Sequence, residues 1–242
     1  MAVVTINGEY GSGAIEIGAM VAQLLEANYV DRLILVEAAK RIGATVETLA
    51  EREQHHRTFG ERLSRILQNL LERSAVAGLG GEFSPVVMDT ILSHPYEEAS
   101  TRPASSAQEM DDDKFVKVTT EVIRDVAREG NVVIVGRASN VILKDVPGIF
   151  HAGITTPHEK RVSVIAHREN IADAATAEGM AREGERARME LYRKVFKAFK
   201  VSPEDPSLYH ILINMEKLDF ATASSIIVHG ARCFEDMEDG GS

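Results

Sequence analysis

Short apolar runs alternate along the chain with segments in which apolar residues recur every three or four positions. The runs are bounded by glycine or by polar residues, and they are too short to be helices. Continuous apolar runs of this length predict strands that are buried on both faces of a parallel sheet. The strands predicted in this way are residues 2–7, 132–135, 149–154 and 209–214, with a short extended piece at 27–31.

Segments with helical periodicity fill the intervals between these strands. Gly130 stops one of them, and a break is expected near Gly179 or Gly184 in the longest. Strands separated by helices predict an α/β fold in which a doubly wound parallel sheet is covered on both faces. The predicted helices are 14–26, 33–41, 45–53, 115–129, 157–168 and 171–200, and a last helix begins at 220–228.

A further apolar stripe lies in the middle of the chain and is followed by a segment of different character. The stripe predicts an amphipathic helix whose apolar face is either core or an oligomer surface. Residues 74–113 contain many Gly, Pro and Ser residues and end in three aspartates, which predicts a variable insertion with a mobile loop at 93–113. The stripe consists of Phe59, Leu63, Ile66, Leu67, Leu70 and Leu71.

The composition fits a single α/β domain that spans residues 1–242, because 242 residues, 44% of them hydrophobic, suffice for one sizeable core. There is no apolar run of the length that crosses a membrane, so no membrane partner is expected. The first residues lead into a predicted strand without the pattern of a secretory signal. A single cysteine, Cys233, excludes an intramolecular disulfide and a cysteine-based zinc site, so a cytoplasmic location is expected.

The chain is acidic, with a formal net charge of −10 and a sequence pI of about 5.3. Proteins that bind nucleic acid present a basic face, so the overall charge argues against a nucleic-acid partner. Positive charge is nevertheless concentrated in residues 182–200. Such a stretch indicates either an anionic ligand or an ordinary solvated helix face, and the charge pattern leaves both open.

The sequence GEYGSG at residues 8–13 separates the first predicted strand from the first predicted helix. A strand, a glycine-rich turn and a helix start are the layout of a phosphate-binding loop, because glycines let backbone N–H groups converge on an anion at the positive end of the helix. Loops of the G-x-x-x-x-G-K-[ST] type carry a lysine and a hydroxyl after the last glycine, where this chain has Ala14 and Ile15. The alternative interpretation is a tight turn that binds no ligand.

Arg137 directly follows the strand predicted at 132–135. It would project from the carboxyl edge of the sheet, where doubly wound folds bind their ligands. The planar guanidinium suits bidentate contact with a phosphate. A surface arginine beside a loop is the alternative.

Two predicted helices carry further arginines on one face. Arg182 and Arg186 are four residues apart with Glu183 beside them, and Arg161 and Arg168 are seven apart. Two arginines on one face can hold a phosphate while the acid binds a sugar hydroxyl. The same spacing is also typical of salt bridges on a solvent-exposed helix.

Four short motifs, taken together, resemble those of a known family. In this order and at these intervals they are similar to the cytidylate kinase-like family of P-loop proteins, over residues 2 to about 230 except the insertion. The resemblance implies a P-loop kinase-type three-layer fold with a helical lid region at about 157–200. The motifs are TINGEYGSGAIEIG at 5–18, YVD at 29–31, VIVGRASN at 133–140 and ERA at 185–187.

The resemblance also implies an activity and a set of site residues. The activity is transfer of the γ-phosphoryl group of ATP, with Mg2+, to a nucleoside monophosphate or a similar small phosphate acceptor, so a small-molecule nucleotide is the expected partner. The residues implied to wrap the donor phosphates are Gly8, Gly11, Ser12, Gly13, Ala14 and Ile15. The residues implied to lie at the acceptor are Asp31, Arg137, Arg182, Glu183 and Arg186. The expected catalytic residues are Arg137, Arg186, Arg161 and Arg168, of which the last two lead into the lid.

The chain departs from the family at the loop and after Arg137. Family members often carry arginines around the loop, whereas here Glu9 would add negative charge, and Ser12 or Asp31 would have to replace the loop hydroxyl at magnesium. Ala138 stands where cytidylate kinases have an aspartate that contacts the nucleoside. Loss of a cation at the donor phosphates costs on the order of several kcal/mol of transition-state stabilisation. A catalytically impaired nucleotide- or anion-binding module is therefore the alternative, and a homo-oligomer with a vestigial site is a third hypothesis.

Overall fold

The computed structural model describes residues 2–31, 112–201 and 205–240. The helices predicted at 33–41 and 45–53 and the apolar stripe at 59–71 lie outside the described residues. The same holds for the predicted insertion up to residue 111.

The centre of the fold is a sheet of five parallel strands in the order β2-β3-β1-β4-β5. The central strand β1 pairs with β3 through Ile6 and Val135 and with β4 through Gly8 and Ile154. All four predicted strands and the short extended piece are therefore confirmed. The strands are β1 Val3–Gly8, β2 Asn28–Val30, β3 Val132–Val135, β4 Ile149–Thr155 and β5 Ile211–Asn214.

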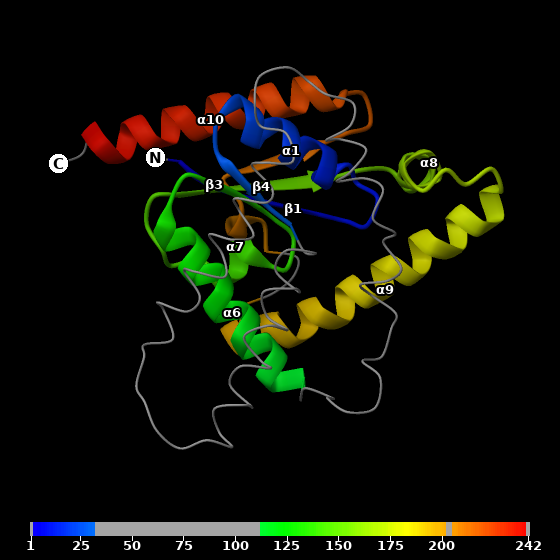
Figure 1. The fold of residues 1–242 in the computed structure, drawn as a ribbon, viewed down its shortest axis with the longest axis horizontal. Coiled ribbons are helices and arrows are strands. Elements are labelled where there is room, and N and C mark those ends of the chain that lie inside the picture. Colours follow the sequence, from blue (N-terminus) through cyan, green and yellow to red (C-terminus); the bar gives the residue numbers. More distant parts are fainter. Residues whose placement is uncertain (1, 32–111, 202–204, 241–242) are drawn as a thin grey trace.

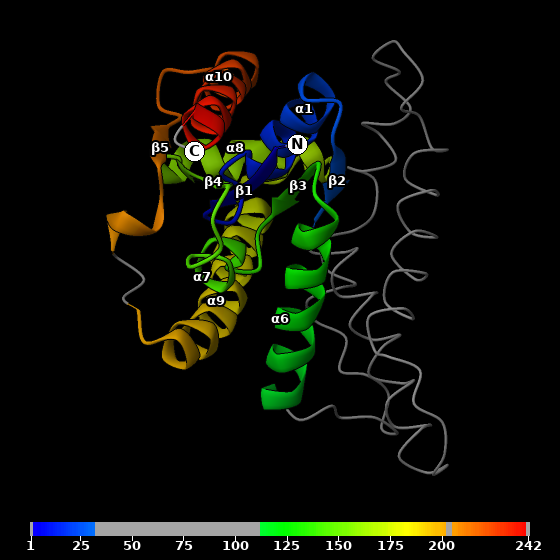
Figure 2. The ribbon, with the colours of Figure 1, turned by 90° about the vertical axis from the view of Figure 1, so that its left-hand side faces the viewer.

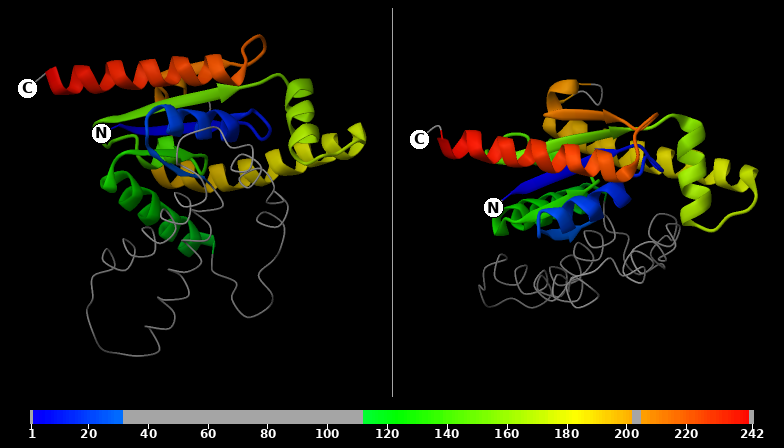
Figure 3. Two further views of the ribbon diagram at one scale, coloured as in Figure 1. Left: turned by 45° about the horizontal axis from the view of Figure 1, so that its top comes forward. Right: turned by 90° about the horizontal axis from the view of Figure 1, so that it is seen from above.

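Helices cover both faces of the sheet and give three layers (Figures 1 and 2). One face carries α1 and α10, and the other carries α6, α7 and α9, while α8 lies beyond the carboxyl ends of the strands (Figure 3). A short 3-10 helix, η1, spans Pro206–Leu208. The helices are α1 Ala14–Leu24, α6 Asp112–Glu129, α7 Ser139–Ile142, α8 His158–Arg168, α9 Ala174–Phe199 and α10 Phe220–Gly240.

The apolar core lies on both faces of the sheet. Ile6 of β1 packs with Ile17 of α1 and Ile227 of α10 in one cluster, and Ile134 of β3 packs with Ile123 of α6 in the other. All five side chains are fully buried. None of the helices in the described ranges is long and apolar enough to span a membrane.

One predicted helix start and one predicted helix break differ from the structure. Residues 112–114 are helical and belong to α6, although they lie before the predicted start and residues 112 and 113 were assigned to the predicted loop. Helix α9 is continuous, so the expected break near Gly179 or Gly184 is wrong. A glycine inside a helix costs about 1 kcal/mol, which the tertiary packing of a long helix readily offsets.

Candidate functional site

The glycine turn connects β1 to α1 and is held by close contacts. Gly11 and Gly13 have φ angles of 79° and 86°, which side chains rarely adopt. A Cβ atom at Gly11 would lie 2.8 Å from the carbonyl oxygen of Arg161, and one at Gly13 would lie 2.5 Å from the ring of Phe220. The turn therefore passes between α8 and α10 only because these positions are glycine. Gly13 is the N-cap of α1 and supplies no side-chain cap, so the first amides of the helix remain available to an anion.

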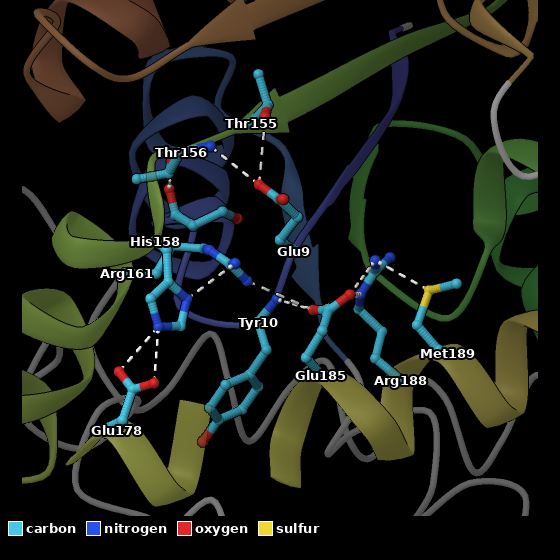
Figure 4. Close-up of polar contacts among 11 residues, drawn as sticks. Glu9, Tyr10, Thr155, Thr156, His158, Arg161, Glu178, Glu185, Arg188 and Met189 are labelled. Carbon is cyan, nitrogen blue, oxygen red and sulfur yellow. Dashed lines mark hydrogen bonds and ion pairs between the residues drawn. The ribbon is translucent and has the colours of Figure 1, made fainter. Parts of the chain in front are cut away.

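Glu9 ties this loop to the end of β4. Its carboxylate accepts hydrogen bonds from Oγ1 of Thr155 at 3.2 Å and from the backbone N–H of Thr156 at 3.0 Å. The hydroxyl of Thr156 in turn donates to the carbonyl oxygen of Ser12 at 2.9 Å. Figure 4 shows the Glu9 carboxylate turned toward the two threonines and away from Glu185. Its negative charge is thus bound by donors at the strand end.

Tyr10 anchors the loop to the two helices of the predicted lid region. Its ring is 3% exposed and packs with Ile165 of α8 and Ala181 of α9. The guanidinium carbon of Arg168 lies 5.7 Å from the ring centroid. On the other side, a Cβ atom at Gly184 would lie 2.6 Å from the ring, so the tyrosine packs directly on the backbone of α9. The loop and the helices α8 and α9 therefore form one packed unit.

The carboxylate of Glu185 stands at the centre of the polar contacts beside the loop (Figure 4). It accepts a hydrogen bond from the backbone N–H of Tyr10 at 2.9 Å and from Nη2 of Arg188 at 2.6 Å. Nη1 of Arg161 lies 3.8 Å from the same carboxylate. Burial would raise the pKa of Glu185, but the hydrogen bonds from Arg188 and Tyr10 hold it below its ordinary value. A loop amide and two guanidinium groups thus converge on one negative charge.

Arg161 and Arg168 of α8 both lie next to the loop, but they are held differently. The Arg161 side chain is 13% exposed, its Nη2 lies 3.3 Å from Nδ1 of His158, and its buried Nε has no hydrogen-bond partner among the described residues. The Arg168 side chain is 5% exposed and pairs with Glu169 at 3.0 Å and Glu16 at 3.7 Å. Burial would lower the pKa of Arg168, but these carboxylates raise it. Arg161 is the better placed of the two to contact a ligand.

Arg137 lies in a strained turn at the carboxyl end of β3. Gly136, Arg137 and Ala138 have φ angles of 82°, 55° and 53°, and two of these three left-handed residues carry side chains. The left-handed conformation costs roughly 1–2 kcal/mol for each residue with a Cβ atom. Tyr192 of α9 stabilises the turn, because its hydroxyl accepts a hydrogen bond from the backbone N–H of Ala138 and donates one to Oδ1 of Asn7 at 2.9 Å. The backbone of the turn that carries Arg137 is therefore held by its contacts with α9 and β1.

Asp31 follows β2 at the same edge of the sheet, as its place in the sequence predicts. It is 6% exposed, and the hydroxyl of Tyr29 donates to its Oδ2 at 3.5 Å. Burial raises the pKa of Tyr29 well above its ordinary value, and the charges of Asp31 and Glu16 raise it further. The acid is thus held by Tyr29 at the end of β2.

The predicted residues of α9 lie on its outer side. Arg182, Glu183 and Arg186 are exposed, and Arg182 pairs with Glu178 of the same helix at 2.8 Å. The described contacts do not bring these three to the loop, and their role at an acceptor stays a prediction. Of the polar α9 side chains, Glu185 bonds to the loop through Tyr10 N–H, and Arg188 binds Glu185.

The pairing of Glu185 with Arg188 beside the loop was not predicted from the sequence. A signal was present, because the buried or half-buried residues of α9 follow a spacing of four and three that is typical of one helix face. That face runs through Ala181, Glu185, Arg188, Tyr192 and Val195.

No cluster of three or more metal-binding side chains occurs within the described ranges. The hydroxyl of Ser12 is buried and has no hydrogen-bond partner there. A Cβ atom at Gly8 would collide with that hydroxyl, so the oxygen lies against the start of the loop. Magnesium uses few protein ligands and takes the rest from phosphate and water. One buried hydroxyl at the start of the glycine loop therefore fits a magnesium nucleotide, and it does not fit a metal held by protein alone.

A parallel sheet with a glycine turn between β1 and α1, and with arginines at its carboxyl edge, defines a P-loop kinase-like fold. The chain belongs to the cytidylate kinase-like family, whose model matches residues 3–217. No curated protein matches the sequence.

Two solved structures are similar to this chain. An uncharacterized protein from Eubacterium ventriosum is 19% identical, with a TM-score of 0.55, and the match covers 96% of this chain and 99% of that one. This likeness supports the fold. TT1252 from Thermus thermophilus is 15% identical, with a TM-score of 0.39, and the match covers 95% of this chain and 97% of that one.

Proposed function

We propose that this protein is a phosphotransferase that moves the γ-phosphoryl group of ATP to a nucleoside monophosphate or a similar small phosphate acceptor. The observation that supports it most is the convergence of Tyr10 N–H, Arg161 and Arg188 on one negative charge beside the glycine turn. Arg137 and Asp31 lie at the same edge of the sheet, after neighbouring strands. Membership of the cytidylate kinase-like family agrees with this use of the site.

The donor phosphates would be held mainly by the backbone. The loop from Gly8 to Ile15 offers amides and the positive end of α1, and Arg161 offers the nearest side-chain cation. Magnesium, bound through Ser12 and the phosphates, would neutralise charge that develops on the transferred group. Arg168 would act by holding Tyr10 and hence the loop.

The acceptor would lie at the carboxyl ends of β3 and β2. Arg137 would bind its phosphate bidentately, because the strained turn and Tyr192 fix the backbone from which the guanidinium extends. Arg182, Glu183 and Arg186 would reach the acceptor only after a change in the position of α9. Phosphoryl transfer needs no covalent intermediate with the protein, since positioning and charge neutralisation supply most of the catalysis.

Arg161 and Arg188 compensate for the lysine that the loop lacks. Both side chains are mostly buried beside the loop, where a charge interacts more strongly than in water. Ala138 is buried and offers no polar side chain to a base, so the nucleoside of the acceptor is left unassigned.

A coupled assay with ATP, magnesium and a panel of monophosphates tests the proposal. We expect turnover with at least one acceptor, and we expect Arg137→Ala to reduce kcat/KM by about 100-fold or more, the loss typical of removing a charged group that positions a reactant. Arg193→Ala is the control, because Arg193 is exposed on α9. No turnover with any acceptor, or equal turnover in Arg137→Ala, would refute the proposal.

A nucleotide- or anion-binding module without turnover is the second candidate. The observation in its favour is the loop itself, in which Ala14 and Ile15 replace a cation and a hydroxyl. ATP binding without turnover would favour this function.

A further inference from the structure

The contacts of Glu185 have the composition of a phosphate-binding position. Arg188 reaches both carboxylate oxygens, with Nε at 3.1 Å from each and Nη2 at 2.6 Å from Oε1. The N–H of Tyr10 donates to Oε2 at 2.9 Å, and Nη1 of Arg161 lies 3.8 Å from the same oxygen. Backbone amides and arginine forks are the donors that proteins use for phosphoryl oxygens.

We infer that the Glu185 carboxylate stands in a phosphoryl subsite formed by Tyr10 N–H, Arg161 and Arg188, and that a phosphoryl group takes this subsite by displacing it. Glu185 thereby acts as a built-in competitor of the ligand. The inference rests on the proposed function, because the phosphoryl group in this subsite would belong to the bound nucleotide.

Each of the three donors also has contacts that do not involve Glu185. The guanidinium carbon of Arg188 lies 4.6 Å from the ring centroid of Tyr192, which is buried. Arg161 is held by His158, and Tyr10 is fixed by its packing on Gly184. Removal of the Glu185 carboxylate therefore leaves two cations and an amide directed at the same point.

Glu185 itself is the movable partner. Its side chain is 27% exposed, compared with 23% for Arg188 and 13% for Arg161. Rotation toward solvent rehydrates the Glu185 carboxylate and frees its rotamers, and an anion with more charge than one carboxylate takes over the hydrogen bonds that Glu185 gives up. Two guanidinium groups carry one more charge than Glu185 neutralises, which favours an arriving phosphoryl group.

Neighbouring carboxylates are engaged elsewhere. Glu9 is bound by Thr155 and Thr156, and Glu178 is bound by His158 and Arg182. Glu185 is thus the carboxylate that the loop amide and both arginines share.

Pyrophosphate binding, measured by isothermal titration calorimetry, tests the inference without turnover. We expect Glu185→Gln, which keeps the size and removes the charge, to bind pyrophosphate about tenfold more tightly than the wild type. The reason is that the variant lacks the negative charge that competes with pyrophosphate for the same donors. Glu185→Ala should bind at least as tightly as Glu185→Gln. Glu190→Gln removes the same charge from an exposed position of α9 and should leave the affinity unchanged.

Equal or weaker binding in both Glu185 variants would overturn the inference and would show that Glu185 serves to position the arginines. A failure to bind in Glu185→Ala would overturn it as well. The coupled assay decides the proposed function separately. The wild-type protein could transfer phosphoryl groups without any displacement of Glu185 by the ligand. Tighter pyrophosphate binding without turnover in any variant would support the subsite and refute the phosphotransferase.

Discussion

The hydroxyl of Tyr192 donates a 2.9 Å hydrogen bond to Oδ1 of Asn7, although the two residues are 185 positions apart. Both side chains are buried, and Asn7 continues the network by donating to Oγ of Ser139 at 3.1 Å. The contact joins α9 to the strand that enters the glycine loop and to the turn that carries Arg137. A single hydroxyl thus connects the strand before the glycine loop with helix α9.

Tyr192→Phe should therefore affect both stability and binding. The ring under Arg188 is kept, but Ala138 N–H and Asn7 Oδ1 lose a buried partner, which costs about 1–3 kcal/mol. Urea unfolding should show this loss, and KM for the acceptor should rise because Arg137 is less well held. Unchanged stability and unchanged KM would contradict the role of the hydroxyl.

Gly184→Ala should destabilise the protein even though alanine favours helix. The new Cβ atom would lie 2.6 Å from the buried ring of Tyr10, and overpacking of this kind costs about 1–3 kcal/mol. Gly179→Ala is the matched control in the same helix, because nothing lies within 4 Å of its Cβ position. Thermal unfolding should show Gly179→Ala stabilised by about 0.5–1 kcal/mol and Gly184→Ala destabilised. Equal effects of the two changes would show that Tyr10 does not pack on α9.

Stability should fall in mild acid because of His151. Burial, together with the charge of the nearby His210, lowers the pKa of His151 from 6.5 to about 4. Since the folded-state pKa lies below the unfolded one, the contribution is fully present above about pH 6.5 and is lost as the pH falls toward about 4, a change of about 3 kcal/mol.

Urea unfolding at pH 7 and pH 4.5 checks this loss. Replacement of His151 by Gln removes the titrating ring and should flatten the pH dependence, whereas His229→Gln, at an exposed position, should keep it. Identical pH dependence in His151→Gln and the wild type would contradict the assignment.

Local patterns predicted the sheet because every strand is a short apolar run between polar or glycine residues. Val132–Val135, for example, is buried along its whole length, so all four of its positions are apolar and the strand is visible in the sequence. The glycine turn was also predicted from a local pattern, because its backbone conformation needs glycine at residues 11 and 13.

The inner face of α9 was not predicted, because it is set by contacts over long separations. Glu185 and Tyr10 are in contact although they are 175 positions apart in the sequence. Gly184 suggests a helix break in the sequence, but in the structure it leaves room for the ring of Tyr10. The orientation of Glu9 toward Thr155 and Thr156 likewise depends on which strand lies next to β1. Charge patterns along α9 alone indicated Arg182 and Arg186, which are exposed.

Isothermal titration calorimetry with ATP tests the central claim most directly, namely that loop amides and arginines from distant segments hold a nucleotide without the usual lysine. With magnesium present, the wild type should bind ATP, and Arg161→Ala should bind it at least about tenfold more weakly, since one charge-assisted contact is lost. Arg193→Ala should bind it as the wild type does. If the wild type gives no heat of binding, or if Arg161→Ala matches it, the claim is contradicted.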